Sequence, residues 1–93
     1  MIRLNCFFQA GEGEHDYNDA LRAAVSLAEK SRKHPGCIAY DVFVSTSRSD
    51  VLMVCDTWQD KESLAQHAIT PEYKMYCKIM NACGTFKIEQ FEF

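Results

Sequence analysis

The segment VLMVCDTWQDKESLAQHAITPEYKMY, residues 51–76, decides the fold of this chain. It begins with a run that is apolar at every position, which is typical of a strand buried on both faces, and this strand ends in Asp56 and Trp58. A short helix follows with His67 near its C-terminal end, and the next helix begins with two tyrosines one turn apart. We therefore expect an acid, a histidine and aromatic rings to meet at one end of a small domain, as in a ligand pocket.

The flanking sequence supplies the remaining elements of an α+β domain. In chain order, the pattern predicts strand Ile2–Gln9, a helix from Asp16 to a stop at His34-Pro35-Gly36, strands Cys37–Ser45 and Val51–Trp58, helix Lys61–Ala68, a helix from Thr70-Pro71 to about Cys83, and strand Thr85–Phe93. This order is the split βαβ plan of a ferredoxin-like sandwich, in which the first and third strands are central. Residues 1–93 fit a single domain.

The third strand also predicts a partner. Helices cover only one face of a ferredoxin-like sheet, yet Val51–Cys55 is apolar on both faces, and 93 residues leave nothing to cover the second face. The alternation of the last strand changes phase before Phe91 and Phe93, which we interpret as a bulge or bend that directs the strand end outward. We expect a homodimer in which two sheets face each other.

Composition and charge exclude several classes of function. The formal charge of −3, without a cluster of Lys or Arg, gives no surface suited to nucleic acid or to an acidic membrane. The longest apolar runs are too short to span a bilayer. The first residues, MIRLNCFFQ, lack the plan of a signal peptide, so we expect a cytoplasmic protein.

The five cysteines predict neither disulfides nor a metal site. Their number is odd, their positions are scattered and no export signal is present, so we expect reduced thiols that pack as small apolar groups. No CxxC motif or Cys/His cluster has the spacing of metal ligands, and no Gly-rich loop suits a phosphate. We expect no metal and no cofactor.

The motifs PGCIAYDVF, VLMVCDTW and TPEYKMY, with His67 nine residues after the tryptophan, resemble the antibiotic biosynthesis monooxygenase domain family over essentially the whole chain. The resemblance implies a dimeric α+β barrel. Several members oxidise quinols or polycyclic phenols with O2 and without metal or flavin, while relatives process a phosphorylated quorum-sensing sugar or degrade haem.

Two departures from the family pattern narrow these expectations. Position 56 is Asp where the family more often has Glu, so a contact made by this acid is one methylene shorter. At Asn5 the chain resembles the haem-degrading branch. However, the catalytic tryptophan of that branch corresponds to His67 in this chain, and its iron-ligating histidine corresponds to a position near Cys77, where this chain has no histidine. Haem degradation is therefore disfavoured.

The chemistry of the predicted site follows from these residue types. His67 suits the removal of a phenolic proton, and Asn5 would donate a hydrogen bond to the developing oxyanion. We expect His67, Asn5 and a tyrosine of the last helix to face one cavity between sheet and helices. The residues predicted to bind substrate are Tyr73, Tyr76, Phe7, Tyr40, Trp58 and Asp56. Each of these residues also has a purely structural interpretation, and His15 and His34 are expected to be solvated.

Three functions remain open from the sequence. The first is a cofactor-independent monooxygenase acting on a quinol-like or phenolic ring. The second is an isomerase or lyase acting on a small carbonyl compound, phosphorylated or not, because TPEYK resembles the sugar-processing branch at least as well. The third is a non-catalytic module that binds a small ligand. A phosphorylated substrate requires fixed positive charge, for which the sequence offers Arg3, Lys74, Lys78 and Lys87.

Overall fold

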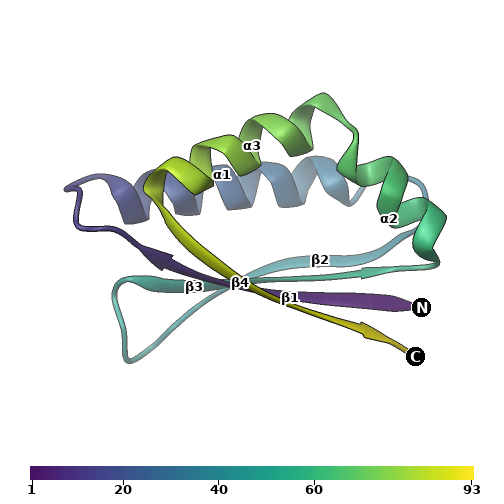
Figure 1. The fold of residues 1–93 in the computed structure, drawn as a ribbon, viewed down its shortest axis with the longest axis horizontal. Helices are drawn as coiled ribbons and strands as arrows, with labels where there is room; N and C mark the ends of the chain where they lie inside the picture. The colour runs from purple at the N-terminus through teal and green to yellow at the C-terminus, as the bar shows by residue number, and fades with distance from the viewer.

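The computed structural model describes residues 1–93 as a four-stranded antiparallel sheet with all helices on one face (Figure 1). The elements in chain order are β1 (Ile2–Ala10), α1 (Asp16–Ser31), β2 (Cys37–Val44), β3 (Val51–Trp58), α2 (Lys61–Ala68), α3 (Pro71–Cys83) and β4 (Gly84–Glu92). The strand order β2-β3-β1-β4 places β1 and β3 in the centre. The predicted α+β, ferredoxin-like split βαβ fold is confirmed.

Local capping signals explain why the helices begin where they do. The Asp60 side chain accepts a hydrogen bond from the Ser63 N–H at 2.8 Å, and the Thr70 hydroxyl accepts one from the Tyr73 N–H at 3.3 Å. The sequence places Asp16 as the N-cap of the first helix, but Asp16 does not cap α1. It is the first helical residue, and its carboxylate accepts a hydrogen bond from the Gly13 N–H. No helix combines the length and the apolar character that crossing a membrane requires.

The hydrophobic core fills the single layer between the helices and the sheet. Strand alternation directs every second residue of β1 and β3 toward the helices, so Phe8, Leu52 and Trp58 are almost fully buried. α1 contributes a close-packed stripe of small residues, and α3 contributes Met80. The alanines let α1 approach the sheet closely, since a larger side chain at these positions would hold the helix away.

The predicted bulge near the end of the last strand is wrong. β4 pairs with β1 in continuous register from Ala10 opposite Gly84 to Ile2 opposite Glu92. Phe91 lies opposite Arg3 and therefore shares the face of the sheet that the helices leave open. The phase change in the sequence thus marks a switch of apolar residues from one face to the other. The register shift in this sheet occurs instead in β2, between Cys37 and Ala39.

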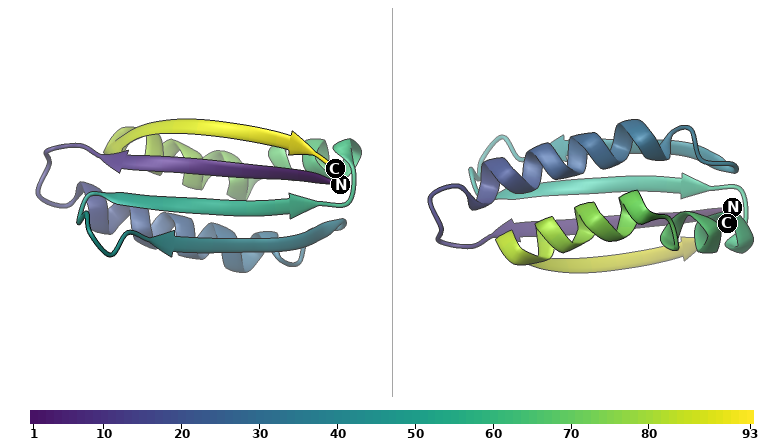
Figure 2. Two further views of the ribbon diagram at one scale, coloured as in Figure 1. Left: turned by 90° about the horizontal axis from the view of Figure 1, so that it is seen from below. Right: turned by 90° about the horizontal axis from the view of Figure 1, so that it is seen from above.

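The second face of the sheet carries no helix (Figure 2). Phe43, Met53, Phe7 and Lys87 form one row of cross-strand neighbours across it, and Phe7 and Phe43 are 39% and 51% exposed. A single sheet face with exposed aromatic rings at its centre is unusual for a protein without a partner. We call this surface the open face.

The two ends of the chain lie side by side at the end of the sheet nearest α2 (Figure 1). The Met1 ammonium donates a hydrogen bond to the Phe93 carbonyl at 2.6 Å, and the Phe93 N–H donates one to the Met1 carbonyl at 2.9 Å. These bonds continue the β1–β4 ladder one residue beyond the end of each strand.

A tight turn fixes the distance between the end of α1 and the beginning of α2. Gly36 has a φ of 80°, and a Cβ at this position would lie 2.0 Å from the Ser63 Oγ. The Gly36 carbonyl accepts a hydrogen bond from the Gln59 N–H at 2.8 Å. Only glycine satisfies both the backbone angle and the close approach, and the result is that His34 lies against α2.

Candidate functional site

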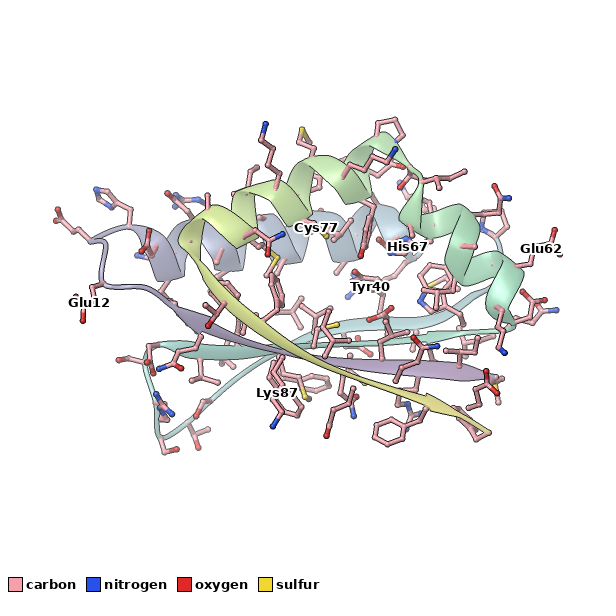
Figure 3. The ribbon with its side chains drawn as sticks, in the orientation of Figure 1. Glu12, Tyr40, Glu62, His67, Cys77 and Lys87 are labelled. Carbon is pink, nitrogen blue, oxygen red and sulfur yellow. The ribbon has the colours of Figure 1, made fainter.

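A cavity of about 180 Å³ lies between the sheet and α3. Most of its lining is apolar, and its few polar groups come from β2, β3 and the helices. Figure 3 shows Tyr40, His67 and Cys77 directed into this layer, whereas Lys87 lies on the opposite side of the sheet. The lining residues are Leu4, Cys6, Leu27, Tyr40, Val54, Asp56, Leu64, His67, Tyr73, Cys77, Met80, Asn81, Phe86 and Ile88.

His67 is the most unusual residue of this cavity. It lies in the last turn of α2, is only 2% exposed, and packs against the rings of Trp58, Tyr73 and Tyr40 at centroid distances of 4.4, 4.8 and 5.6 Å. Its Nε2 has no hydrogen-bond partner. The Ser31 Oγ is the only other buried side-chain atom that lacks one. A buried polar atom without a partner is rare in folded proteins and is often explained by function.

The other ring nitrogen of His67 is occupied. Its Nδ1 lies 2.9 Å from the Nδ1 of His34, in the turn after α1. The Nε2 of His34 lies in turn 3.2 Å from the Glu72 carboxylate, in the first turn of α3. The expectation that His34 is solvated is therefore wrong, because the Gly36 turn brings it against α2.

The pKa of His67 is lowered to about 4, chiefly by burial and then by the neighbouring His34, while the Glu72 charge acts in the opposite direction. His67 is accordingly neutral at pH 7 and holds a lone pair on one ring nitrogen. A neutral imidazole whose free nitrogen is not hydrogen-bonded can accept a proton or a hydrogen bond from a ligand in the cavity.

Asp56 is the only carboxylate in the cavity lining. Its Oδ2 accepts a hydrogen bond from the Trp58 indole N–H at 2.7 Å, because residues i and i+2 of β3 point to the same face. Burial raises the pKa of Asp56 to about 6, and the indole hydrogen bond partly offsets this shift. Asp56 is therefore mostly ionised at pH 7 and protonated in weak acid.

The thiols and phenols of the cavity are neutral at physiological pH. Burial raises the pKa of both Cys6 and Tyr73 to about 12, and it also raises the pKa of Cys77 and of Tyr40. A protonated thiol is a poor nucleophile and packs as a small apolar group. His67 and Asp56 are thus the two groups of the cavity able to accept a proton at pH 7.

Four of the sequence-predicted site residues meet at this cavity, namely His67, Asp56, Tyr40 and Tyr73. Trp58 lies behind His67 and does not line the cavity, although it holds both His67 and Asp56 in position. Tyr76 packs at the edge of the core, with its ring 5.6 Å from the Lys30 Nζ.

The expectation that Asn5 shares the cavity with His67 is wrong, and so is the expected placement of Phe7. Asn5 lies opposite Cys55 and Glu89, and both it and Phe7 project from the open face of the sheet. The physical reason is strand alternation: Leu4 and Cys6 take the inward positions of β1, so their neighbours point outward.

Sequence reasoning missed several residues of the site. Cys77 and Asn81 follow Tyr73 at steps of four on α3, so helical periodicity alone would have placed them on the same face. Cys6 would have followed from the alternation of β1. His34 and Glu72 carried no comparable local signal, because their contact with the site depends on the packing of three elements.

The lining contains no Lys or Arg. Arg3 projects from the open face, where its Nε donates a hydrogen bond to the Thr57 hydroxyl at 3.2 Å. Lys87 also lies on the open face (Figure 3). Lys74 and Lys78 are exposed on α3. No group of three or more His, Cys, Asp or Glu side chains is placed to hold a metal ion.

The family model for antibiotic biosynthesis monooxygenases matches residues 1–78. Among solved structures, a conserved protein of unknown function from Bacteroides thetaiotaomicron, described as a possible oxidoreductase, is 43% identical, with a TM-score of 0.93 over 99% of this chain and 96% of that one. An antibiotic biosynthesis monooxygenase is 22% identical, with a TM-score of 0.88 over 100% and 98%. SnoaB from Streptomyces nogalater, a cofactor-independent oxygenase, is 10% identical, with a TM-score of 0.79 over 99% and 91%. No curated protein matches the chain.

Proposed function

Because this chain belongs to the antibiotic biosynthesis monooxygenase family, we propose that it is a cofactor-independent monooxygenase that oxidises a quinol-like or phenolic small molecule with O2. In such a reaction the substrate anion itself gives the electrons to O2. The protein must remove a phenolic proton, keep the anion away from water and admit O2. SnoaB, which shares the fold, is a cofactor-independent oxygenase, and this precedent supports the proposal.

The observation that carries the proposal is the free Nε2 of His67. It belongs to a neutral imidazole in the wall of an apolar cavity, and it has no hydrogen-bond partner in the protein. A phenolic O–H would satisfy this nitrogen and would then be in place to transfer its proton. The rings of Tyr40 and Tyr73 provide flat apolar walls beside it.

The size of the cavity favours one aromatic ring over a polycyclic substrate. An engineered apolar cavity of about 150 Å³ binds benzene, and the cavity of this protein is about 180 Å³. The two proton acceptors, His67 and Asp56, match the two O–H donors of a quinol better than the single donor of a simple phenol. A substituted benzene-diol is therefore the substrate class that fits best.

The main alternative, an isomerase or lyase acting on a phosphorylated carbonyl compound, requires a cation near the substrate. None of the 14 residues that line the cavity is a Lys or Arg. A phosphate in this apolar space would lose its hydration without gaining a charged partner. The lining supports an uncharged ring, although an unphosphorylated carbonyl compound or a sequestered ligand is compatible with the same cavity.

We further propose that the protein acts as a cytoplasmic homodimer whose subunits associate through the open face. Phe7, Phe43 and Met53 give this face an apolar centre, and the family forms dimeric barrels. The cavity lies on the other side of the sheet, so each subunit would carry its own site.

The proposal is tested by oxygen uptake with a panel of benzene-diols and naphthalene-diols, with purified protein that has been treated with chelator. We expect consumption of one O2 per single-ring diol, with formation of a hydroxyquinone that carries one oxygen atom of O2 and release of the other oxygen atom as water. The chelator should have no effect. A second assay tests the isomerase or lyase function: phosphorylated ketoses are incubated with the same protein, and their conversion is followed by NMR.

Each outcome separates the candidate functions. Turnover of a phosphorylated ketose without O2 uptake would replace the monooxygenase by the second function. Saturable binding of a diol without any turnover, measured by calorimetry, would leave a binding module. His67→Phe, which fills the position without a ring nitrogen, is the matched control for both activities.

A further inference from the structure

His67 lies between two spaces of different character. One is the apolar cavity, and the other is an outer polar hollow lined by His34, Pro35, Glu62, Ser63, Gln66, His67 and Thr70. His34 reaches His67 from the side of this hollow, and Glu72 in turn contacts His34. The side chains of His34 and Glu72 are 16% and 31% exposed. The three residues come from the turn after α1, from α2 and from α3, so their contact is a product of the tertiary fold.

The contacts assign the protons of the two imidazoles. A carboxylate has no hydrogen to donate, so the Glu72 oxygen, 3.2 Å from the Nε2 of His34, keeps the hydrogen of neutral His34 on that nitrogen. The Nδ1 of His34 is then a bare acceptor. Since it lies 2.9 Å from the Nδ1 of His67, the hydrogen of His67 is on Nδ1. The Nε2 of His67, which is buried without a partner, is left with its lone pair.

We propose that Glu72 and His34 form a proton relay: they hold His67 in the tautomer with a bare Nε2, and they receive the charge when His67 takes a proton from the cavity. The inference rests on the proposed function in treating His67 as the base. His34 and Glu72 are positioning residues, because neither touches the cavity.

The transfer balances in two steps. The O–H bond of the substrate breaks, its electron pair stays on oxygen and its proton forms an N–H bond at the Nε2 of His67. The Nδ1–H bond of His67 then breaks, and that proton bonds to the Nδ1 of His34. The positive charge now lies on His34 beside the Glu72 carboxylate. The reverse transfers return the proton to a reduced oxygen in the cavity and restore both starting tautomers without rotation of either ring.

The relay solves an energetic problem of the site. A charged imidazolium at position 67 would be buried among Trp58, Tyr40 and Tyr73, where burial already lowers the pKa of His67 to about 4. A base this weak removes a phenolic proton poorly. Moving the charge to His34 places it next to a carboxylate and closer to solvent, so the pair is a stronger base than His67 alone.

The test is nitrogen-15 NMR of the labelled histidines at pH 7, which distinguishes a protonated ring nitrogen from a bare one. We expect the Nδ1–H tautomer for His67 and the Nε2–H tautomer for His34. Glu72→Gln keeps an oxygen acceptor and should keep both tautomers, whereas Glu72→Ala should release His34 and give a mixture at both rings. Glu62→Ala, which removes the acid from the first turn of the neighbouring helix, is the matched control and should change neither ring.

The relay is overturned by His67 in the Nε2–H form, or by unchanged tautomers in Glu72→Ala. These readouts need no substrate, so they stand even if no diol is oxidised. Where a diol is turned over, we expect Glu72→Ala and His34→Ala each to lower kcat roughly 10–100-fold, with Glu72→Gln intermediate. Turnover that is abolished by His67→Phe and unaffected by Glu72→Ala and His34→Ala would keep the proposed function and refute the relay.

Discussion

The two faces of the sheet differ in almost every respect, although they share the same four strands. The face under the helices carries fully buried side chains and encloses the cavity, with Trp58, Asp56 and His67 locked in one hydrogen-bonded and stacked group. The open face carries half-exposed rings such as Phe7 and Phe43 beside the charged groups of Arg3 and Lys87. The helices of the same chain cover one face, and no part of the chain covers the other.

The two faces of this small domain are therefore suited to two different functions, catalysis and association. The helix-covered face is the one suited to the proposed chemistry, because only there is a polar atom kept out of water and left without a hydrogen-bond partner. The open face is suited to association, because exposed aromatic rings gain free energy when a second surface covers them. A change on one face should therefore alter catalysis, and a change on the other should alter assembly.

The largest effect expected from this comparison is on turnover. His67→Ala should lower kcat by roughly 10²–10⁴-fold, because it removes the proposed base. Asn5→Ala, a change of similar size on the open face, should leave kcat within a few-fold. The measurement is oxygen uptake with a diol that the wild-type protein oxidises. Equal losses from the two variants would show that the open face also takes part in the chemistry.

Dimer formation should depend on the open face and not on the helix-covered side of the protein. The protein should run at about twice the chain mass in light scattering at micromolar concentration. Phe43→Asp should weaken the dimer roughly 10²–10⁴-fold, since each buried aromatic ring contributes about 1.5–3 kcal/mol and the two-fold interface counts it twice. Met75→Asp places the same charge on an exposed apolar position of α3 and should not change the mass. A wild-type monomer at this concentration would refute the interface.

The free energy of unfolding should depend on pH through two groups of the helix-covered face, Asp56 and His67, whose effects have opposite signs. Asp56 binds its proton more tightly in the folded state, with a pKa of about 6, so its contribution to stability falls as the pH rises from 4 to 6. His67 binds its proton more tightly in the unfolded state, because its folded pKa is about 4, so its contribution rises over pH 4 to 6.5. Each amounts to about 3 kcal/mol, and in the wild-type protein they largely cancel.

Urea unfolding at several pH values tests this cancellation. Asp56→Asn, which keeps an acceptor for the Trp58 indole, should become more stable as the pH rises from 4 to 6.5. His67→Gln should become less stable over the same range. Parallel profiles for both variants and the wild-type protein would mean that neither group changes its pKa on folding.

The smallest expected effect concerns the turn that brings His34 to the site. Gly36→Ala should lower the free energy of unfolding by about 1–2 kcal/mol from the left-handed backbone alone, with a further loss from the contact with Ser63. Adding Ser63→Gly should recover only the second part, which thermal unfolding would measure. Because the turn lies on the helix-covered side, Gly36→Ala should leave the dimer intact.

Local signals explain what the sequence predicted well. β3, α2 and α3 have the predicted bounds. The two helices begin where predicted because Asp60 and Thr70 accept hydrogen bonds from backbone N–H groups three residues further along the chain. The covered and open faces followed from the number of helices available. His67, Asp56, Tyr40 and Tyr73 were also placed correctly at one cavity.

The errors arose where position depends on other elements. Asn5 was assigned to the inward face of its strand, whereas the packed structure puts the alternate residues Leu4 and Cys6 inside. His34 looked like a solvated residue at a helix end, since nothing in its neighbourhood along the chain indicates that it meets His67 and Glu72. The spacing of residues along one element is readable from sequence, but contacts among three elements require the packed structure.

The first and last residues of the chain lie close enough together for the domain to be closed into a covalent ring. Met1 and Phe93 already exchange two backbone hydrogen bonds, so a short linker would join them without moving either strand. New ends could then be opened in the exposed loop at 45–50, at the opposite end of the sheet (Figure 1). In the resulting circular permutant β1 and β4 would become a hairpin and β2 and β3 the terminal strands, while every strand pairing and the whole cavity lining would be retained.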